Sequence, residues 1–491
     1  MIFALVLIPV IAAALAMLIR SDVLCRGVLV LTAAVHAGLT GWAWIARPEP
    51  VMKGWLAIDD LGLLFLSIVS LLFLTATIYA VGYLRNEHGG EQEDMEEGFL
   101  FNNAPEARFT GCLLMFLATM TLVTVSRHLG LLWVAVEATT LASAPLIYFH
   151  RHHRSLEATW KYLLICSVGI ALALLGNFFL VVAASVPESG SVSLMLSDLI
   201  GLGEKMQTPW LKAAFLFLLV GYGTKMGLAP LHTWLPDAHS ESPSVVSALL
   251  SGALLNCAFL GILRGHQICR AAGLEMFSRD LLILFGLISI GWAAVFILNQ
   301  ADYKRMLAYS SVEHMGILAL GVGVGGGAIF GAMLHAVNHS LTKAMLFLVA
   351  GNILAAYKTK STADVRGVVR ALPISGVLWV AGFLAITGMP PFGIFMSKLT
   401  IIKAMLDQGR GWMTAGFLGM LAVIFVGMSA TMLKMAQGRA PEMRLGEMKS
   451  EKIWSLVPPA ILSVLILILG LYIPPVVSEV LGDVAKALGG E

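Results

Sequence analysis

The fold is decided by residues 215–264, which read FLFLLVGYGTKMGLAPLHTWLPDAHSESPSVVSALLSGALLNCAFLGILR. An apolar run reaches Lys225, and Pro230 and Pro236 interrupt the backbone shortly after it. A charged side chain at the centre of a bilayer costs about 2.5–3.5 kcal/mol on insertion scales. A lysine beside a broken apolar helix therefore indicates either a charged partner elsewhere in the chain or a functional site.

The composition is that of a membrane protein. The 491 residues are 58% hydrophobic and only 13% charged, with a mean hydropathy of +0.85, whereas soluble domains carry about 25% charged residues. A net charge of +2, without a basic block that contains aromatic residues, argues against nucleic-acid binding. The five cysteines are scattered, so we expect neither an iron–sulfur cluster nor a zinc site in this chain. The N-terminal segment is expected to be a retained helix, because it lacks a positive n-region and a cleavage site.

Apolar segments of about 20 residues, the length that spans a bilayer, predict an all-α polytopic protein with about fourteen transmembrane helices. The predicted spans are 2–19, 27–46, 61–83, 109–127, 129–149, 158–184, 209–238, 243–263, 281–299, 306–324, 328–356, 372–406, 412–433 and 453–473. Three of these are long and interrupted: the seventh by Pro230 and Pro236, the eleventh by the polar run 338–343, and the twelfth by the Gly/Pro run 388–393. Lipid cannot satisfy freed backbone groups, so we expect these three to be buried or to line a hydrated path.

The two proline-broken spans predict internal symmetry. Lys225 in the seventh span and Lys398 in the twelfth both lie beside Pro/Gly interruptions. Units five spans apart would be inverted in the membrane, which is the arrangement of many transporters. We therefore expect three N-terminal helices in 1–108, a first inverted repeat of five helices in 109–263, a second in 281–433, and a final helix and tail in 453–491. The connecting loops are too short to fold a cofactor-binding domain.

Lysine and arginine predict the orientation. Loops after odd-numbered spans hold seventeen of these residues, and loops after even-numbered spans hold nine. Positive residues accumulate on the cytoplasmic side. We expect a multi-pass protein of the cell (inner) membrane with both termini outside.

Several ionisable residues lie within the predicted spans. Glu137 is the expected partner of Lys225, because a Glu/Lys pair offsets part of the desolvation cost of each charge; the alternative is a hydrogen-bonded packing residue. His335, His339 and Lys343 recur at i, i+4 and i+8, so they share one face of a helix. They form either a relay, for which histidine is suited, or a polar seam packed against a neighbour.

Three more residues flank the interruptions. His232 and His239 follow the break after Lys225. Lys398 follows GMPPFGIFMS, and it is either a buried functional group or a side chain that snorkels to the interface. The HxxxH spacing of His335 and His339 lacks a third ligand, so we expect no metal site.

Four segments resemble a known family: GTKMGLAPLHTWLPDAHSESP (223–243), ADYKRMLAYSSVEHMG (301–316), HAVNHSLTKAMLFLVAGN (335–352) and GMPPFGIFMSKL (388–399). They are similar to the antiporter-like membrane subunits of respiratory complex I, Mrp-type cation/proton antiporters and group 4 nickel–iron hydrogenases, and look most like the hydrogenase-4 or formate-hydrogenlyase type. The resemblance implies a proton-translocating subunit of a redox-driven complex. It also implies no cofactor in this chain, other membrane subunits and a peripheral redox arm as partners, and iron–sulfur, nickel–iron or flavin groups in those partners.

The resemblance also implies roles for particular residues. Glu137 and Lys225 would form a pair in one half-channel, Lys343 and His339 would be central groups, and Lys398 would be the exit residue. Many relatives carry a lysine or histidine where this chain has Asn256, and an amide cannot carry a proton at neutral pH.

Three explanations of Asn256 stay open. Water bridges the gap, or His232 and His239 supply the titrating group, or the subunit pumps weakly. Two other functions also stay open: a stand-alone Na⁺/H⁺ antiporter or Mrp subunit, and a non-pumping scaffold for a hydrogenase-like enzyme. In none of these does the chain catalyse bond chemistry alone.

Overall fold

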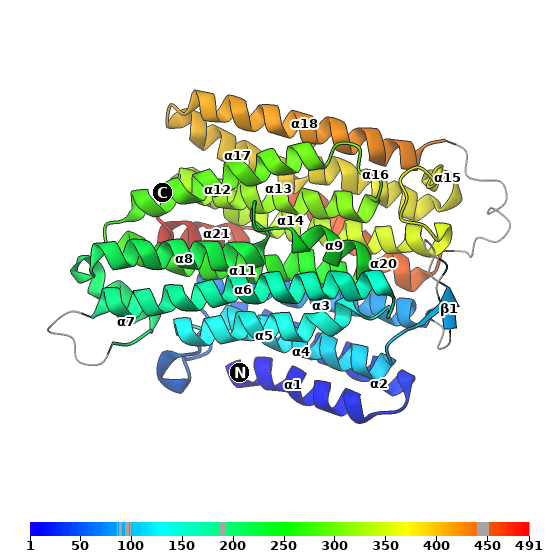
Figure 1. Cartoon of the computed structure of the whole chain (residues 1–491), viewed down its shortest axis with the longest axis horizontal. Coiled ribbons are helices and arrows are strands. Elements are labelled where there is room, and N and C mark those ends of the chain that lie inside the picture. The colour runs from blue at the N-terminus through cyan, green and yellow to red at the C-terminus, as the bar shows by residue number, and fades with distance from the viewer. Residues whose placement is uncertain are drawn as a thin grey trace.

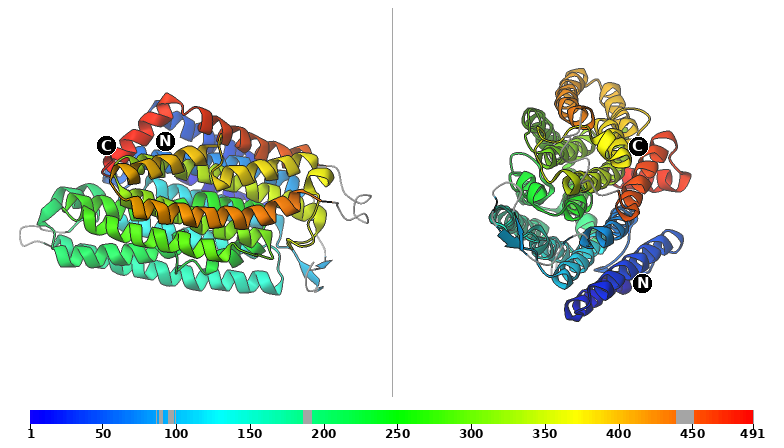
Figure 2. Two further views of the ribbon diagram at one scale, coloured as in Figure 1. Left: turned by 90° about the horizontal axis from the view of Figure 1, so that it is seen from above. Right: turned by 90° about the vertical axis from the view of Figure 1, so that its right-hand side faces the viewer.

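The long apolar runs become long helices that lie side by side in one bundle (Figures 1 and 2). A computed structural model describes residues 1–490 apart from 86, 88–90, 94–97, 99, 186–191 and 439–450. Some of the basic residues used to predict the orientation therefore lie outside the described residues.

The elements follow in chain order. The helices are α1 (Ile2–Leu18), α2 (Asp22–Ile45), α3 (Asp60–Leu84), α4 (Glu106–Val125), α5 (Leu129–Ile147), α6 (His153–Ala184), α7 (Leu196–Leu202), α8 (Thr208–Met226), α9 (Trp234–Glu241), α10 (Ser244–Leu249), a π-helical turn η3 (Leu250–Leu254), α11 (Leu255–Ala271), α12 (Glu275–Phe296), α13 (Tyr303–Val324), α14 (Gly327–Tyr357), α15 (Val368–Ala371), α16 (Pro373–Thr387), α17 (Gly393–Asp407), α18 (Gly411–Ala436), α20 (Ile453–Leu471) and α21 (Pro475–Ala487). Short 3-10 turns occupy Met52–Gly54 and Gly203–Lys205, and two short strands, β1 (Glu91–Glu93) and β2 (Leu100–Asn102), pair antiparallel.

The prediction of a helical membrane protein is confirmed. Among the described residues, eleven helices are long and apolar enough to cross a membrane, and Ile2–Leu18 and Pro373–Thr387 are shorter apolar helices. The total of fourteen crossings and the inverted repeats stay predictions. Both termini lie at the same end of the bundle, and the β1–β2 hairpin and α15 lie at the other end (Figure 1).

Two of the three predicted interruptions are present. The first separates α8 from α9 at Pro230, and the second separates α16 from α17. The predicted break at Pro236 is wrong, because this proline lies in the first turn of α9, where its missing N–H is tolerated. At both breaks the first helix ends at a glycine in the left-handed region, Gly227 at φ 84° and Gly388 at φ 83°, a conformation that closes helix ends and favours glycine. At the first break, the backbone N–H of Ala229 donates to Ser289 Oγ (2.9 Å), and the Trp234 indole donates to the Thr224 carbonyl (2.8 Å). The freed groups are thus satisfied inside the protein, as membrane burial requires.

The third predicted interruption is wrong, because α14 is one continuous helix through the polar run 338–343. That run contains neither proline nor glycine. Its hydroxyls bond to the preceding turn: Ser340 Oγ donates to the Ala336 carbonyl (2.6 Å), and Thr342 Oγ1 donates to the Asn338 carbonyl (2.7 Å). Polar side chains can therefore be accommodated without breaking the helical ladder.

A partly buried ion cluster joins three parts of the bundle at the end that carries the termini. Arg264 of α11, only 1% exposed, binds Asp59 with both terminal nitrogens (2.7 and 2.8 Å), and Arg127 also binds Asp59 (2.9 Å). Asp59 in turn caps the start of α3 by accepting from the Gly62 N–H (2.9 Å). Burial alone would raise the pKa of the Asp59 carboxyl, but the two guanidiniums hold it well below its usual range.

We expect Arg264→Met to lower the unfolding midpoint in detergent by several degrees. Removing one partner of a fully buried pair costs about 3 kcal/mol, and the loss here should be about 1–2 kcal/mol because Asp59 keeps Arg127 and is itself 26% exposed. The matched control is Arg47→Met, which removes the exposed Arg47–Asp60 pair (38% and 41% exposed) at the same end of α3. Exposed pairs contribute less than about 1 kcal/mol. Equal midpoints for the two variants would contradict the prediction.

Candidate functional site

Lysines 225, 343 and 398 lie buried inside the bundle, at 0%, 0% and 5% exposure. They come from α8, α14 and α17, so the fold brings together residues that are far apart in the sequence. Charges at such positions require specific partners. The partners differ at each lysine, and they define what each site can do.

Lys225 is held by neutral groups at the end of α8. Its ammonium donates to Thr140 Oγ1 (2.9 Å) and to the Tyr162 hydroxyl (2.6 Å). The same nitrogen lies 4.4 Å from the centroid of the Tyr162 ring, a cation–π distance. A lysine held by hydroxyls and a ring can exist in either protonation state without leaving an anion unpaired.

Glu137 does not contact Lys225 directly, in contrast to the predicted pair. Glu137 Oε2 accepts from Thr140 Oγ1 (3.2 Å), and its other oxygen accepts from Ser167 Oγ (3.0 Å). Thr140 lies one turn after Glu137 on α5, at the level that Lys225 reaches, so its hydroxyl stands between the two charges. The hydrogen bonds run in one direction, from Lys225 to Thr140 and from Thr140 to Glu137.

Lys343 of α14 points at α13. Its ammonium donates to the Leu307 carbonyl (2.5 Å) and to Ser310 Oγ. Among the described residues it forms no ion pair, although Glu313 is close enough to interact electrostatically. Lys343 is thus the second buried lysine that is held by neutral acceptors.

The predicted His335/His339/Lys343 stripe faces a third histidine, His314 of α13. His314 Nδ1 lies 2.8 Å from His335 Nε2, and His335 Nδ1 lies 2.8 Å from Ser397 Oγ. The His314 ring also packs 5.1 Å from the His339 ring. Both ring nitrogens of His339 are buried without a hydrogen-bond partner among the described residues.

Hydrogen-bond directions assign the protons on this chain. Ser397 donates its hydroxyl to the Ile394 carbonyl (2.9 Å), so it accepts from His335 Nδ1. His335 Nε2 must then accept from His314 Nδ1 when both rings are neutral. This leaves the lone pair of His314 Nε2 facing the Glu313 carboxylate at 3.9 Å. The lone pair of His314 Nε2 and the Glu313 carboxylate repel each other in this state. A proton held between them would make the contact between these two groups attractive.

Lys398 is paired inside the protein rather than snorkelling to the interface. Its ammonium lies 3.1 Å from Glu313 Oε1, and Glu313 is only 1% exposed. Lys398 also donates to the carbonyl of Thr387, the last residue of α16 (3.5 Å), so its side chain reaches back across the break. A side chain on Gly388 would meet Lys398 Cδ at 3.1 Å, so glycine leaves the space for this lysine.

Asn256 connects α11 to α14 between the first two lysines. Its Nδ2 donates to Ser340 Oγ (2.7 Å) and to the Gly252 carbonyl (2.9 Å). Its Oδ1 is buried without a partner among the residues that the structure places. The next residue, Cys257, lies close enough to Lys225 to interact with its charge, whereas Ser340 lies one turn before Lys343.

The two histidines of the first break are placed differently. His239 of α9 is fully buried, stacks on Phe347 of α14 (4.9 Å between ring centroids) and interacts electrostatically with Lys343. Neither of its ring nitrogens has a partner among the described residues. His232 instead packs edge-on against Trp292, and among the described residues it makes no contact with the three lysines.

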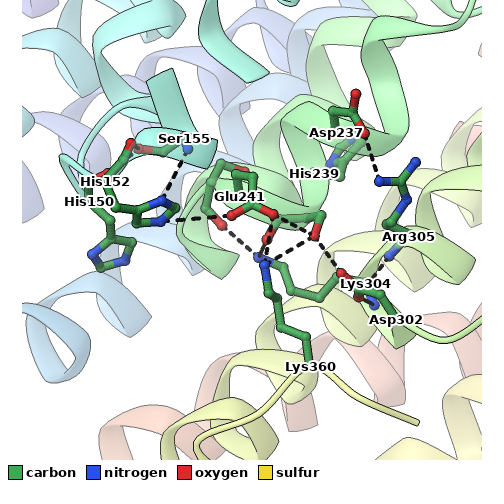
Figure 3. A network of polar contacts seen from close by, with 12 residues as sticks. His150, His152, Ser155, Asp237, His239, Glu241, Asp302, Lys304, Arg305 and Lys360 are labelled. Atoms are coloured by element: carbon green, nitrogen blue, oxygen red, sulfur yellow. Dashed lines mark hydrogen bonds and ion pairs between the residues drawn. The ribbon is translucent and has the colours of Figure 1, made fainter. Parts of the chain in front are cut away.

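The end of α9 is fixed to the start of α13 by the network in Figure 3. Lys304 donates to the carbonyls of Ser240 (3.1 Å) and Ser242 (2.6 Å). Two ion pairs, Asp237–Arg305 and Glu241–Lys360, are both 2.8 Å long. Because α13 also carries Ser310, Glu313 and His314, a single helix contacts α9, Lys343 and Lys398.

Several partners of the lysines and histidines are not among the predicted site residues, and these include Glu313 and His314. The other missed groups carry hydroxyls: Thr140, Tyr162, Ser310 and Ser397. Their only sequence signal is a small polar residue that faces the interior of an apolar helix, which is a common feature of membrane helices.

Known proteins share this fold and sequence pattern. Residues 126–435 match the family model described as NADH:quinone oxidoreductase/Mrp antiporter, TM. The Hydrogenase-4 component F homolog of Methylacidiphilum infernorum (isolate V4) is 36% identical over 426 residues, which cover 86% of each chain. NADH-quinone oxidoreductase subunit N of Desulforudis audaxviator (strain MP104C) is 30% identical over 82% of this chain and 80% of its own length. A chain of the archaeal membrane-bound sulfane sulfur reductase superposes with a TM-score of 0.86 at 21% identity, over 100% of this chain and 98% of that one.

Proposed function

Because the chain belongs to the NADH:quinone oxidoreductase/Mrp antiporter family, we propose that it translocates protons as an antiporter-like membrane subunit of a redox-driven complex. The type of complex is that of hydrogenase-4 or NADH:quinone oxidoreductase. Other membrane subunits and a peripheral arm would assemble with it and hold the redox groups. The free energy would reach this chain as electrostatic or conformational change.

Fourteen crossings follow if α1 and the two broken pairs, α8/α9 and α16/α17, are added to the eleven long apolar helices. The matching left-handed glycines at the two breaks support two inverted repeats, in 109–263 and 281–433. Both termini would face the outside of the cell membrane, as the basic loops predict.

The observation that carries the proposal is a row of groups that can hold a proton, buried apart from the half-buried Glu137, in which Lys225 and Lys343 have neutral partners. It leads from Glu137 through Thr140 to Lys225, then to Lys343, the histidines of α13 and α14, and the Glu313–Lys398 pair. A structural ion pair would be fully compensated on both sides. Lys225 and Lys343 are instead poised to change charge when a neighbouring charge moves.

We infer that the proton crosses the gap between Lys225 and Lys343 by way of internal water and His239. Asn256 cannot take up a proton, and its Nδ2 is already bonded to Ser340 and Gly252. Its free Oδ1 and the free nitrogens of His239 and His339 are the kind of buried polar atoms that bind internal water.

The proposal is tested with Lys225→Met in the whole complex, reconstituted into vesicles. We expect proton uptake per turnover to fall at least tenfold, because methionine cannot carry the charge. The control is Lys403→Met, which removes a lysine that is 75% exposed on α17. Undiminished proton uptake by an intact Lys225→Met complex would contradict the proposal.

Two alternatives give different results. A stand-alone Na⁺/H⁺ antiporter, which the Mrp part of the family makes relevant, would exchange the two ions in liposomes that contain this chain alone. A non-pumping scaffold, for which Asn256 is the main argument, would keep coupling when Glu137, Lys225 and Lys398 are all replaced by alanine.

A further inference from the structure

A groove of about 400 Å³ lies between the start of α4 and the end of α5. Its lining is formed by Ala104, Arg108, Pro145, Tyr148 and Arg151. The start of α4 and the end of α5 lie at the end of the bundle that carries the β1–β2 hairpin (Figure 1). We call it the α4–α5 groove.

Neither arginine of the groove has a hydrogen bond or ion pair from its side chain to any described residue. Glu106, the acidic residue nearest to Arg108 in the sequence, is already bonded to Arg26 through two contacts of 2.6 Å. Two guanidiniums thus line one groove without a carboxylate partner among the residues that the structure describes. The arrangement is complementary to a phosphate group, which guanidinium donors bind with matching geometry.

The groove continues into an apolar surface. Val134 and Leu141 are 49% and 63% exposed on α5, and they share a helix face with Pro145 and Tyr148 because the spacings are seven, four and three residues. Exposed leucine and valine on a membrane helix are suited to contact lipid tails. Tyr148 lines the groove together with the arginines, and tyrosine is a residue type that is enriched at membrane–water interfaces.

We propose that the α4–α5 groove binds an anionic phospholipid. Arg108 and Arg151 bind the phosphate, Tyr148 lies at the headgroup level, and one acyl chain follows Leu141 and Val134. Basic pockets between membrane helices recognise such headgroups through the same combination. The lipid site requires only that the chain spans a membrane. A result that contradicts proton translocation would therefore leave the lipid-binding proposal intact, and the reverse also holds.

The test measures phospholipid binding to the delipidated full chain in detergent by native mass spectrometry. The probes are phosphatidylglycerol, phosphatidylcholine and the soluble headgroup analogue glycerol 3-phosphate. We expect phosphatidylglycerol to bind more tightly than phosphatidylcholine, and glycerol 3-phosphate to compete poorly. Arg108→Gln/Arg151→Gln should weaken phosphatidylglycerol binding about twenty-five-fold, since each basic side chain near the surface contributes about five-fold.

The matched control is Arg370→Gln/Lys434→Gln, which removes two exposed positive charges from the same end of the bundle, on α15 and α18, without touching the groove. Its affinity should stay within about two-fold of the unmodified chain. A second variant, Ala104→Trp, fills the groove and keeps both charges, so it should also weaken binding. Equal affinities for the two lipids, equal losses in the groove and control variants, or displacement by glycerol 3-phosphate at lipid-like concentrations would each overturn the proposal.

Discussion

Lys343→Met is expected to reduce proton translocation by at least a hundredfold while the protein stays folded. Lys343 lies between the Lys225 site and the Glu313–Lys398 pair, and the buried row offers no other lysine at this level. Its removal should be tolerated structurally, because Ser310 can donate its hydroxyl to the Leu307 carbonyl (3.3 Å) that Lys343 now occupies. Methionine fills a similar volume with a flexible side chain.

A second substitution separates proton transfer from simple charge. Lys343→Arg keeps a positive charge but does not release its proton in proteins. If Lys343 carries protons, both variants should fail in proton uptake measured during turnover in vesicles. If Lys343 acts only as a fixed charge for its neighbours, the arginine variant should pump. Pumping by either variant in an assembled complex would contradict the carrier role.

The parts of the fold that the sequence predicted are those with local causes. Glycine and proline next to Lys225 and Lys398 are sufficient to end a helix, so both breaks are at the predicted places. The polar run 338–343 has no such backbone effect, and hydroxyl bonds to the preceding turn keep α14 continuous. A hydropathy pattern cannot distinguish polar side chains that break a helix from those whose hydroxyls donate hydrogen bonds to carbonyls of the same helix.

The parts of the site that could not be predicted depend on how helices are rotated against each other. Glu313 meets Lys398 across a separation of 85 residues, and Lys225 meets Thr140 rather than Glu137, which lies one turn earlier on α5. A difference of a single helical turn decides whether two charged groups contact each other directly or are bridged by a hydroxyl group. Such differences are set by packing of the whole bundle, so the spacing of charged residues alone leaves them open.

Glu313→Gln is expected to cause both a large loss of stability and a loss of pumping. Lys398 and Glu313 are 6% and 1% exposed at their side chains, and removal of one partner of a buried pair costs about 3–5 kcal/mol because the other charge is left uncompensated. Glutamine also removes the carboxylate that faces His314 Nε2 at 3.9 Å. The stability effect is measured as the unfolding midpoint in detergent. The control is Asp407→Asn, which removes the exposed Lys403 pair on the same helix as Lys398 and should cost less than about 1 kcal/mol.

The double variant Glu313→Gln/Lys398→Met distinguishes the two roles of the pair. Without the lysine, the glutamine no longer faces an unpaired charge, so the unfolding midpoint should recover most of its loss. Proton uptake should not recover, because the group that receives the proton from His314 and the lysine that passes it on are both gone. Recovery of pumping together with stability would show that Glu313 and Lys398 only hold α13 and α17 together. If stability is restored but pumping is not, the pair is part of the proton path. A pair with only a structural role would no longer be needed for pumping once the fold is stable.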